Sequence, residues 1–548
     1  MVFNPTSYPR TDLVTVRVSL PMEVEAVEAV GPEGERQPCE ITRREHFETE
    51  VVDLDAGRFL DAISWATWGT VDGQGVQAVE TSLRGEMAVV DLVLSSLPPR
   101  VEVVEWGRSA IETLLADEGI RHWRLQLHRF VELDVRFVAS GVPGHGYKTY
   151  ALRPVLRSAE SEVPAPLPCL ENEYFLVEAD PNSGLLTVID KATGAVLPQL
   201  HRFVDGGDRG DEYNYCPPEN DRLITAPGAH LCVRGFRSSP VRQTLEISQV
   251  YMVPAGLTGD RAYRSDELTP LPIRSRVSLS PGVPRIDFVT TVQNCAKDHR
   301  LRVHFPVPII TDLSYAEGHF DVLARSLELP ANTENWPEQP VATQHQRTFV
   351  DVNDGLIGLL VANRGLPEYE VISGQDAVTV ALTLLRCVGW LSRNDIQCRR
   401  GHAGPGLSTP GAQCLGTHVF EYALVPHRGS WEHAYPMAHA FSAPLRSVAV
   451  PQSVGRLPAT LSFVEAQPSE FVLSAIKQSE DTHGLIVRGC NVSDRAIEVT
   501  LKLGDAWRRA MRVSLNEEHQ GGLISEDNVA CFLANPKQVV TLRFEVHR

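Results

Sequence analysis

The chain has 548 residues, of which 43% are apolar and 22% charged, and its formal net charge is −18. One hydrophobic core stops growing at roughly 250–300 residues, so we expect three or more domains. Because an acidic surface repels phosphate backbones and anionic lipid, this charge excludes nucleic acid and membrane surfaces as expected partners and leaves a neutral ligand open.

The N-terminal sequence MVFNPTSYPRTD has no apolar core and no small-residue cleavage site, so we expect no signal peptide. No stretch approaches the roughly 18 apolar residues that span a bilayer. The ten cysteines contain no CxxC pair and are far too sparse for a disulfide scaffold. These features predict a soluble, reduced, cytoplasmic protein.

Alternation of apolar and polar side chains is the dominant pattern along the chain. It is clearest in residues 14–20, 131–137, 497–503 and 540–546. Successive side chains of a strand point to opposite faces, so this pattern predicts sheets with one buried face. Between 277–279 and 286–288, the pair Pro281-Gly282 predicts the turn of a hairpin.

The clearest helix candidate covers residues 109–116. Ser109 and Glu112 have the spacing of a capping box, and Gly119 follows as a stop signal. One helix among so many strands predicts an all-β fold, with a large antiparallel β-sandwich flanked by smaller β-sandwich domains and a short helical insertion. The sequence has no repeat of 20–50 residues, which excludes a propeller or a solenoid.

Proline-rich stretches at 163–168 and 444–458 predict domain boundaries, and a weaker one lies at 97–99. We therefore expect an N-terminal β domain over residues 1–160, a large sandwich over 165–450 and a C-terminal β domain over 451–548. Residues 56–130, with the helix, are expected to form an insertion within the first domain.

A series of short motifs follows in a fixed order. They are LENEYF at 170–175, DPNSGL at 180–185, FVDGGDRGDEYNY at 203–215, WPE at 336–338, NRGLPEYE at 363–370, GWLSR at 389–393, RGHAGP at 400–405 and TPGAQC at 409–414. This series resembles the C-terminal region of glycoside hydrolase family 38, the α-mannosidases, and residues 203–215 resemble its signature loop. The resemblance implies a galactose mutarotase-like super-sandwich and covers nearly the whole chain except the insertion.

The same resemblance implies that the catalytic domain precedes the point where this chain begins. In the family that domain supplies a zinc site and an Asp nucleophile, so we expect no catalytic residue and no metal ligand here and an inactive chain on its own. His319 and Asp321 have the spacing of a metal pair, but a zinc site needs three or four ligands and none accompanies them. Structural packing is the preferred interpretation of this pair.

Four acids lie in the signature loop: Asp205, Asp208, Asp211 and Glu212. Removing a mannosyl group with retention requires two carboxyl groups about 5–5.5 Å apart. The loop could therefore hold a catalytic dyad, contact the substrate, or form a turn whose Asp side chains satisfy backbone N–H groups. Substrate contact is the preferred interpretation, and the structural turn is its main alternative.

The resemblance assigns roles to individual residues. Tyr213 matches a tyrosine that contacts the sugar, and Arg400 is the best match to an arginine that does the same. A phenol and a guanidinium can both donate hydrogen bonds to sugar hydroxyls. Asp211 and Glu212 are expected to contact the substrate as well. Three further residues are expected to position the loop: Asp208, Arg393 and Asp395, the last two as an ion pair.

Histidines 402, 418, 427, 433 and 439 lie close in sequence, but alternation places them on separate strands and loops, so we expect no metal site. Cys398 and Cys414 have no neighbouring His that could act as a base, and we interpret both as buried apolar residues.

Three functions remain open. The first is the carbohydrate-binding half of a retaining α-mannosidase, acting on an α-mannoside or oligosaccharide with a zinc-dependent catalytic half in cis or in trans. Both a monomer and a homo-oligomer are open for it. The second is a stand-alone carbohydrate-binding protein without catalysis. The third is an aldose epimerase-like enzyme, which would need a positioned His and a carboxylate to move a proton.

Overall fold

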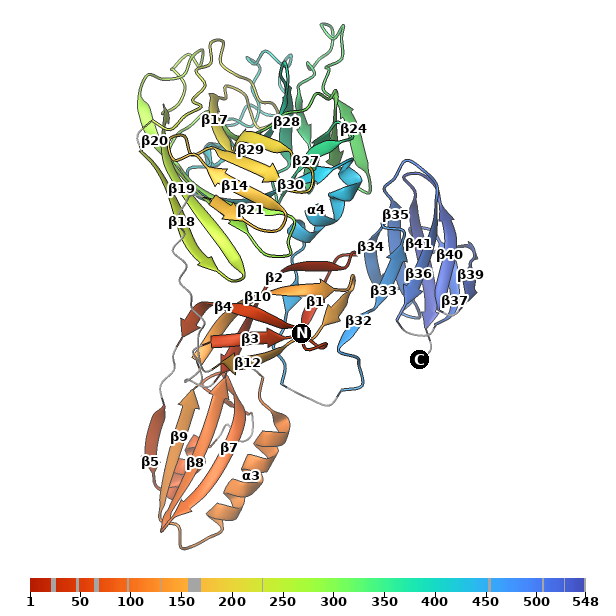
Figure 1. Cartoon of the computed structure of the whole chain (residues 1–548). Helices are drawn as coiled ribbons and strands as arrows, with labels where there is room; N and C mark the ends of the chain where they lie inside the picture. The colour runs from red at the N-terminus through yellow and green to blue at the C-terminus, as the bar shows by residue number, and fades with distance from the viewer. Residues whose placement is uncertain are drawn as a thin grey trace.

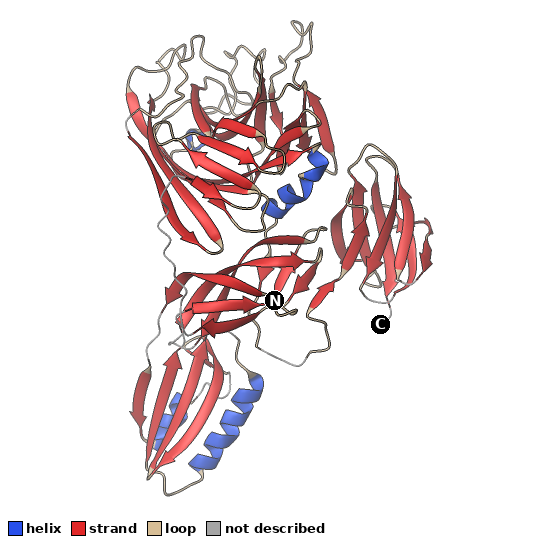
Figure 2. Ribbon diagram, viewed as in Figure 1, coloured by secondary structure: helices blue, strands red, loops and turns tan. Residues whose placement is uncertain are grey.

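The structure, a computed structural model, describes residues 1–20, 26–45, 49–63, 69–95, 98–129, 131–155, 169–228, 230–451, 455–504, 507–526 and 528–546. Strands dominate, and most of them pair antiparallel in several sheets (Figures 1 and 2). The all-β prediction is confirmed. The proline-rich stretch 163–168 lies outside the described residues. No helix in the described part of the chain is both long enough and apolar enough to cross a membrane.

The N-terminal domain lies at the centre of the molecule (Figure 1). Its strands are β1 (Val2–Asn4), β2 (Arg10–Leu20), β3 (Ala26–Val30), β4 (Arg36–Glu45), β10 (Val131–Val142), β11 (Gly146–Lys148) and β12 (Ala151–Val155). The alternation in β2 and β10 is confirmed, because Val14, Val16, Leu133 and Val135 are all buried in one core.

Two later segments complete this central domain. β31 (Arg446–Ser447) pairs with β1, and β32 (Thr460–Ser462) pairs with β11, so one sheet has the order β31-β1-β11-β32. Leu445 lies in the same core as the N-terminal strands. Residues 445–447 and 460–462 therefore return to the first domain before the last one begins.

The insertion between β4 and β10 is a separate small domain with its own core. Its elements are β5 (Glu50–Leu54), α1 (Ala56–Ala62), β6 (Thr70–Val71), β7 (Gln74–Arg84), β8 (Met87–Ser95), α3 (Val101–Leu115) and β9 (His122–Arg129). β8 and β9 are parallel and α3 connects them, which makes a β-α-β unit. The predicted short helical insertion is thus an α/β layer, with helices against one face of a five-stranded sheet (Figure 2).

The helix prediction was wrong in its start. α3 begins at Val101, directly after Pro98-Pro99, and Ser109 lies inside it rather than at its N-cap. Arg100 is the N-cap residue and makes no side-chain capping hydrogen bond. The buried Gly107 hid the N-terminal half of the helix from the sequence pattern. A Cβ there would lie 2.8 Å from a methyl group of Val79, so glycine lets the helix pack closely on β7.

The large sandwich forms the upper part of the molecule in Figure 1 and contains the largest core. Its elements are β13 (Cys169–Glu171), β14 (Phe175–Ala179), β15 (Leu186–Asp190), β16 (Val196–Leu200), β17 (Arg202–Gly207), β18 (His230–Ser239), β19 (Arg242–Pro254), β20 (Leu268–Leu279), β21 (Ile286–Asn294), β22 (His299–Val307), β23 (Leu313–Glu317), β24 (Val322–Ser326), β25 (Thr343–His345), β26 (Phe349–Asn353), β27 (Ile357–Asn363), β28 (Glu368–Ser373), β29 (Val378–Cys387), the 3-10 helix η1 (Pro410–Gln413), β30 (Gly416–Arg428), the 3-10 helix η2 (Trp431–His433) and α4 (Tyr435–Ser442).

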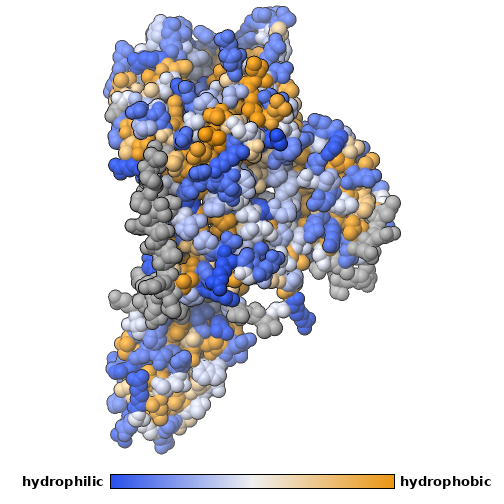
Figure 3. Space-filling model, in the orientation of Figure 1, coloured by the Kyte–Doolittle hydropathy of each residue, from blue (hydrophilic) through white to orange (hydrophobic). Residues whose placement is uncertain are grey.

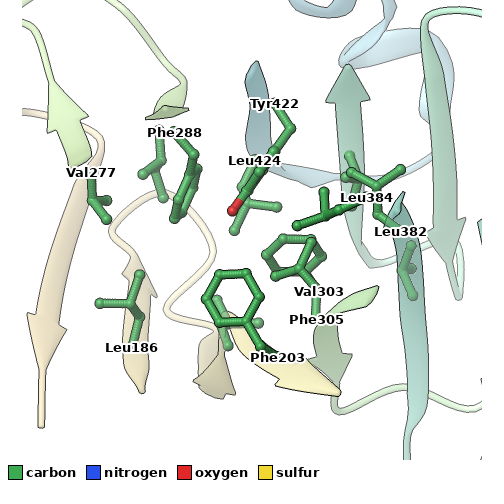
Figure 4. Close-up of a cluster of buried hydrophobic side chains, with 14 of the residues drawn as sticks. Leu186, Phe203, Val277, Phe288, Val303, Phe305, Leu382, Leu384, Tyr422 and Leu424 are labelled. Carbon is green, nitrogen blue, oxygen red and sulfur yellow. The ribbon is translucent and has the colours of Figure 1, made fainter. Parts of the chain in front are cut away.

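Three sheets build this sandwich, with the orders β13-β14-β15-β16, β17-β22-β29-β28-β25 and β18-β19-β20-β21-β30-β27-β26-β23-β24. The hairpin predicted at Pro281-Gly282 joins β20 and β21 and is confirmed. Phe203 of β17 lies among the aromatic rings between the sheets, near Phe288, Phe305 and Tyr422 (Figure 4). This anchor fixes the start of the signature loop in the core.

The C-terminal domain packs beside the central one (Figure 1) and has a core of its own. Its strands are β33 (Val464–Gln467), β34 (Phe471–Gln478), β35 (Leu485–Asn491), β36 (Ile497–Leu503), β37 (Trp507–Val513), β38 (His519–Gly522), β39 (Ile524–Glu526), β40 (Val529–Ala534) and β41 (Val539–Val546). The strands predicted over 497–503 and 540–546 are confirmed. Apolar and hydrophilic residues are interspersed on the face of the molecule shown in Figure 3.

Candidate functional site

Three loops meet at one end of the large sandwich, and we call them the loop rim: residues 208–216, 332–340 and 389–408. Hydrogen bonds connect them. Asn214 donates to Glu338 at 2.5 Å, the Arg393 N–H donates to Asp211 at 2.8 Å, and the Gln339 N–H donates to the Cys398 carbonyl at 2.8 Å. Loops gather at the upper end of this domain in Figure 2. The signature loop is therefore part of one connected surface.

Asp205 lies at the base of the signature loop and is fully buried. It forms an ion pair with Arg264, and its second oxygen is 2.6 Å from Nδ1 of His299. His299 in turn lies 3.0 Å from the Asn294 side-chain oxygen through Nε2. Because its charge and hydrogen bonds are satisfied inside the domain, Asp205 anchors the loop and does not reach a ligand.

Asp208 is also fully buried and closes the loop on itself. One carboxylate oxygen accepts from the backbone N–H of Gly210 at 2.9 Å and of Cys216 at 3.3 Å. The other accepts from Nε of Arg386 at 2.7 Å. A Cβ on Gly210 would lie 2.0 Å from the Asn214 carbonyl oxygen, so the loop closes only with glycine at this position. The structure thus places Asp208 where a loop-positioning residue would lie.

Asp211 requires a correction, since it was expected to contact the substrate. It is fully buried. One oxygen accepts from the N–H groups of Tyr213 and Asn214 at 3.0 and 2.9 Å, and the other accepts from Arg393 N–H at 2.8 Å and Arg399 Nη2 at 2.6 Å. These four bonds use the carboxylate completely, so it supports the backbone of the loop instead of a ligand.

The electrostatics of Asp211 agree with this role. Burial acts to raise its pKa, but the hydrogen bond from Arg399 and the N–H groups of Arg393 and Asn214 outweigh burial and hold the pKa below its usual value. The group is therefore a carboxylate at neutral pH. A shared-proton dyad with Asp208 has no support, because each acid is paired with its own arginine.

Two arginines, Arg386 and Arg399, form what we call the arginine frame. Arg386 donates through Nη2 to the carbonyl oxygens of Asp211 at 2.5 Å and Asn214 at 2.9 Å. Arg399 is only 8% exposed and donates to the Asn214 side-chain oxygen and to the Arg393 carbonyl, the latter at 3.0 Å. The frame thus binds both Asp208 and Asp211, and it also holds the backbone of the signature loop.

Tyr213 projects from this frame and is 53% exposed. The Arg399 guanidinium lies 6.0 Å from the centre of its ring. A Cβ on Gly404 would lie 2.8 Å from its hydroxyl oxygen, so the tyrosine rests against a glycine of the neighbouring loop. Glu212 is exposed beside it, and its N–H donates to the Trp390 carbonyl at 3.1 Å. Both side chains can reach a ligand.

Arg400 is exposed on the same rim, one residue after the buried Arg399. Its N–H donates to the Pro337 carbonyl and its Nη2 donates to the Glu334 carbonyl, both at 2.9 Å. Its guanidinium does not take part in the ion pair of Asp395, which is formed with Arg393. Tyr213 lies beside Arg399 in space and Arg400 follows it in sequence, and both Tyr213 and Arg400 are accessible.

Arg393 and Asp395 form a two-pronged ion pair with contacts of 2.6 and 2.5 Å. The hydrogen bond from Arg393 lowers the pKa of Asp395. The Arg393 guanidinium also lies 5.0 Å from the Trp390 ring, and Arg209 donates to the Asp395 carbonyl at 3.1 Å. The pair thus fixes the loop over 389–408 against the signature loop.

Sequence reasoning missed the arginine frame. Arg386 was given no role, and Arg399 was passed over for its neighbour Arg400. The available signal was the number of acids in a glycine-rich loop, because buried carboxylates require cationic partners. Arg399 and Arg400 are adjacent in a loop, so which of them is buried beside the acid depends on the loop conformation, and the sequence alone does not determine that conformation.

The residues considered for metal binding are dispersed. Asp321 pairs with Lys537 at 2.7 Å, while His319 is exposed. His427 pairs with Asp351 at 2.6 Å and His439 with Glu317 at 2.7 Å, in separate networks. Within the described ranges, no group of three or more His, Cys, Asp and Glu side chains could hold a metal ion.

The two cysteines expected to be buried apolar residues are half-buried instead. The thiol of Cys398 contacts that of Cys216, and the thiol of Cys414 contacts that of Cys387. The error has a physical reason, because both cysteines lie on irregular loop segments where apolar alternation gives no information about burial.

Comparison with known proteins gives two matches to family models. Residues 170–392 match the glycosyl hydrolases family 38 C-terminal domain, and residues 470–543 match the glycosyl hydrolases family 38 C-terminal beta sandwich domain. The signature loop lies within the first match. Arg399 and Arg400 lie just beyond it, and the insertion lies in neither.

A curated protein of Halalkalibacterium halodurans with the provisional name mannosylglycerate hydrolase is 29% identical over 392 residues, which cover 69% of this chain and 41% of the relative. Two solved structures from Enterococcus faecalis share the fold at 24% identity: an alpha-mannosidase (TM-score 0.70) and a protein in the glycosyl hydrolase family 38 (TM-score 0.71). Each covers 99% of this chain, which spans 55% and 57% of their lengths. The chain thus spans about half the length of these relatives.

Proposed function

This chain carries the C-terminal domains of glycosyl hydrolase family 38, and from that premise we propose that it is the carbohydrate-binding portion of a retaining α-mannosidase. In this proposal the loop rim completes the sugar site of a catalytic domain supplied in cis or in trans. The substrate is a terminal α-mannoside or an oligosaccharide that ends in one.

One observation carries the proposal. The signature loop buries and pairs three of its acids, Asp205, Asp208 and Asp211, yet it leaves Tyr213 half exposed on top of them. A loop that existed only to turn the chain would not need a buried arginine frame to hold an exposed phenol. Such a rigid mounting is what a ligand-orienting group requires, because a fixed donor loses little freedom on binding.

The chemistry of the rim fits sugar hydroxyls. The Tyr213 phenol can donate and accept, Glu212 accepts, and the Arg400 guanidinium donates. None of the three described buried acids can act as nucleophile or proton donor while it is held by its arginine. In the proposed enzyme these rim residues bind and orient the sugar, and the two reacting carboxyl groups come from the catalytic domain.

The zinc ion expected from the resemblance belongs to the catalytic domain in this proposal. The described residues offer no cluster of three ligands, so they do not fit such an ion. When bound in the catalytic domain, the metal would hold hydroxyl groups of the same sugar. The contribution of this chain does not pass through the metal.

The test is reconstitution with a separately produced family 38 catalytic domain, assayed on an aryl α-mannoside. We expect activity only from the mixture. Tyr213→Phe and Arg400→Ala should each lower the reconstituted rate by roughly 3- to 100-fold, since each removes a hydrogen bond of about 0.5–1.5 kcal/mol, or more to a charged partner. Arg428→Ala, an exposed arginine at the far end of β30, is the matched control and should leave the rate unchanged.

Two results would contradict the proposal. Binding of α-mannosides without any gain in rate on mixing would support a stand-alone carbohydrate-binding protein. Equal rates for the Tyr213 and Arg400 variants and the control would remove the rim from the sugar site. An epimerase-like function has less support, because His299, His427 and His439 each pair with a buried carboxylate in a different place.

One further observation favours a narrower class of α-mannoside as the substrate. The name of the Halalkalibacterium relative suggests mannosylglycerate, an α-mannoside whose aglycone carries a carboxylate. Arg400 is an exposed cation on the same rim as Tyr213 and could pair with that group. If so, Arg400→Ala should slow hydrolysis of mannosylglycerate by the reconstituted enzyme more than hydrolysis of methyl α-mannoside. Equal slowing would restrict Arg400 to the sugar itself.

A further inference from the structure

Cys216 and Cys398 are distant in the sequence, yet their thiols contact each other in the loop rim. Cys216 directly follows the signature loop, and Cys398 directly precedes Arg399. The Cys398 thiol also donates to the Tyr215 carbonyl at 3.6 Å, which places it against the backbone beside Cys216. The two sulfurs thus lie on the same two segments that the arginine frame connects.

The backbone at both cysteines is fixed. The Cys216 N–H donates to Asp208 at 3.3 Å, and its carbonyl accepts from the Arg209 N–H at 2.8 Å. The Cys398 carbonyl accepts from the Gln339 N–H at 2.8 Å. These bonds fix the backbone on both sides of the thiol pair, and a covalent bond requires the two sulfurs to approach to the roughly 2.05 Å of a disulfide.

Exposure differs between the two sulfurs. Cys216 is 2% exposed, whereas Cys398 is half-buried. A small oxidant can therefore reach Cys398, while Cys216 lies behind it in position to displace whatever Cys398 has captured. The contact between the two thiols lowers the pKa of Cys216 to about 6, in spite of burial, and raises the pKa of Cys398, so the inner sulfur is the thiolate of the pair and can take the proton of the outer one.

A second pair of touching thiols lies deeper. Cys387 is fully buried in the core of the large sandwich, and its sulfur accepts a hydrogen bond from Asn294 at 3.4 Å. Its partner Cys414 is half-buried. This pair lies inside the domain rather than between two segments of the rim, and it serves as an internal comparison.

We propose that Cys216 and Cys398 are a redox-sensitive pair, which a disulfide oxidant such as glutathione disulfide converts into a reversible cross-link of the loop rim. Cys398 passes its proton to the neighbouring Cys216 thiolate and attacks one sulfur of glutathione disulfide, which releases one glutathione. Cys216 then loses this proton and, as the thiolate, attacks the Cys398 sulfur and releases the second glutathione. The protein loses two electrons and two protons, and one glutathione disulfide becomes two glutathione thiols.

The cross-link joins the end of the signature loop to the segment that carries Arg399 and Arg400. It closes a long segment of chain, so oxidation should stabilise the large sandwich. The inference depends only on these sulfurs and their surroundings, and it stands whether or not the rim binds a mannoside.

The experiment uses the full chain equilibrated in glutathione buffers of increasing oxidised fraction, quenched with acid and mapped by mass spectrometry after alkylation. We expect a peptide that links Cys216 to Cys398, reversed by dithiothreitol. The unfolding temperature should rise by about 5–10 °C with the cross-link. Cys398→Ala should abolish both effects, and Cys295→Ala, which removes an exposed cysteine elsewhere, should abolish neither.

Three results would overturn the proposal: glutathione retained on Cys398 without a link to Cys216, a link confined to Cys387 and Cys414, or no linked peptide at a large excess of glutathione disulfide. Peptide mapping of the unmodified sequence decides between these results without any variant. A variant that fails to fold therefore leaves the test intact.

Discussion

Arg399 and Arg400 are neighbours in the sequence with opposite environments. The side chain of Arg399 is held by a buried acid, a side-chain amide and a backbone carbonyl. The side chain of Arg400 is exposed and donates to one carbonyl of the adjacent loop. The first supports the signature loop and the second is free to meet a ligand while the loop stays folded. The two residues should therefore separate stability from binding.

Replacing Arg399 by Leu should destabilise the large sandwich by about 3 kcal/mol, because it leaves Asp211 buried without its cation. At roughly 2–4 °C for each kcal/mol, the calorimetric transition should fall by about 6–12 °C. Arg400→Ala is the matched control and should change the transition by no more than about 2 °C. Equal shifts for the two variants would show that Arg399 does not hold the loop.

Residue roles were predictable only in part. Four acids among glycines indicated the signature loop as a candidate site, which stays a prediction, and the expected ion pair of Arg393 with Asp395 is present. The burial of Asp211 was not predictable, because an acid next to an exposed tyrosine looks accessible until the partner loop is placed. That partner lies on a segment far along the chain, and no local pattern connects the two.

Helix boundaries show the same limit at the level of elements. Strands with clean alternation, such as β2 and β36, were found from their pattern because their buried faces are regular. α3 was found only in its second half, and α1 and α4 were not predicted. The parallel pairing of β8 with β9 was missed too, because it depends on recognising the whole helix between them.

Asp55 and Ser109 compare an observed helix N-cap with a predicted one that lies inside a helix. Asp55 is the N-cap of α1 and accepts from the Arg58 N–H at 2.8 Å, so Asp55→Ala should destabilise the insertion domain by about 1 kcal/mol. Ser109 lies within α3 and is exposed, so Ser109→Ala should be neutral or stabilise by up to about 0.5 kcal/mol. Thermal unfolding followed by circular dichroism measures both. A loss of about 1 kcal/mol at Ser109 would restore the capping box.

On the scale of the whole molecule, the insertion is attached through two strands that already pair. Glu45 at the end of β4 lies opposite Glu132 in β10, so the two points of attachment are adjacent in one sheet. The insertion has its own core, and none of those of its residues that the structure describes belongs to the core of the central domain. It is built as a separate unit on the tip of a hairpin.

Removal of residues 46–131 and their replacement by Asn-Gly should therefore leave the rest of the chain folded. A two-residue turn of this type suits the register of the neighbouring strands. We expect a soluble protein whose remaining unfolding transitions shift by less than about 3 °C, as measured by calorimetry. Aggregation, or loss of the cooperative transition of the large sandwich, would show that the insertion stabilises the other domains.

The sheet with the order β31-β1-β11-β32 has a consequence for synthesis. β1 and β11 form the middle of this sheet, but the outer strands arrive late, since Val2 of β1 pairs with Ser447 and Gly146 of β11 pairs with Ser462. A nascent chain therefore exposes both edges of this sheet until the large sandwich has left the ribosome. Unpaired strand edges invite pairing with other chains, so the emerging N-terminal domain is a natural client for a chaperone. Once the large sandwich is complete, β31 and β32 can pair with β1 and β11, and both exposed edges are then covered.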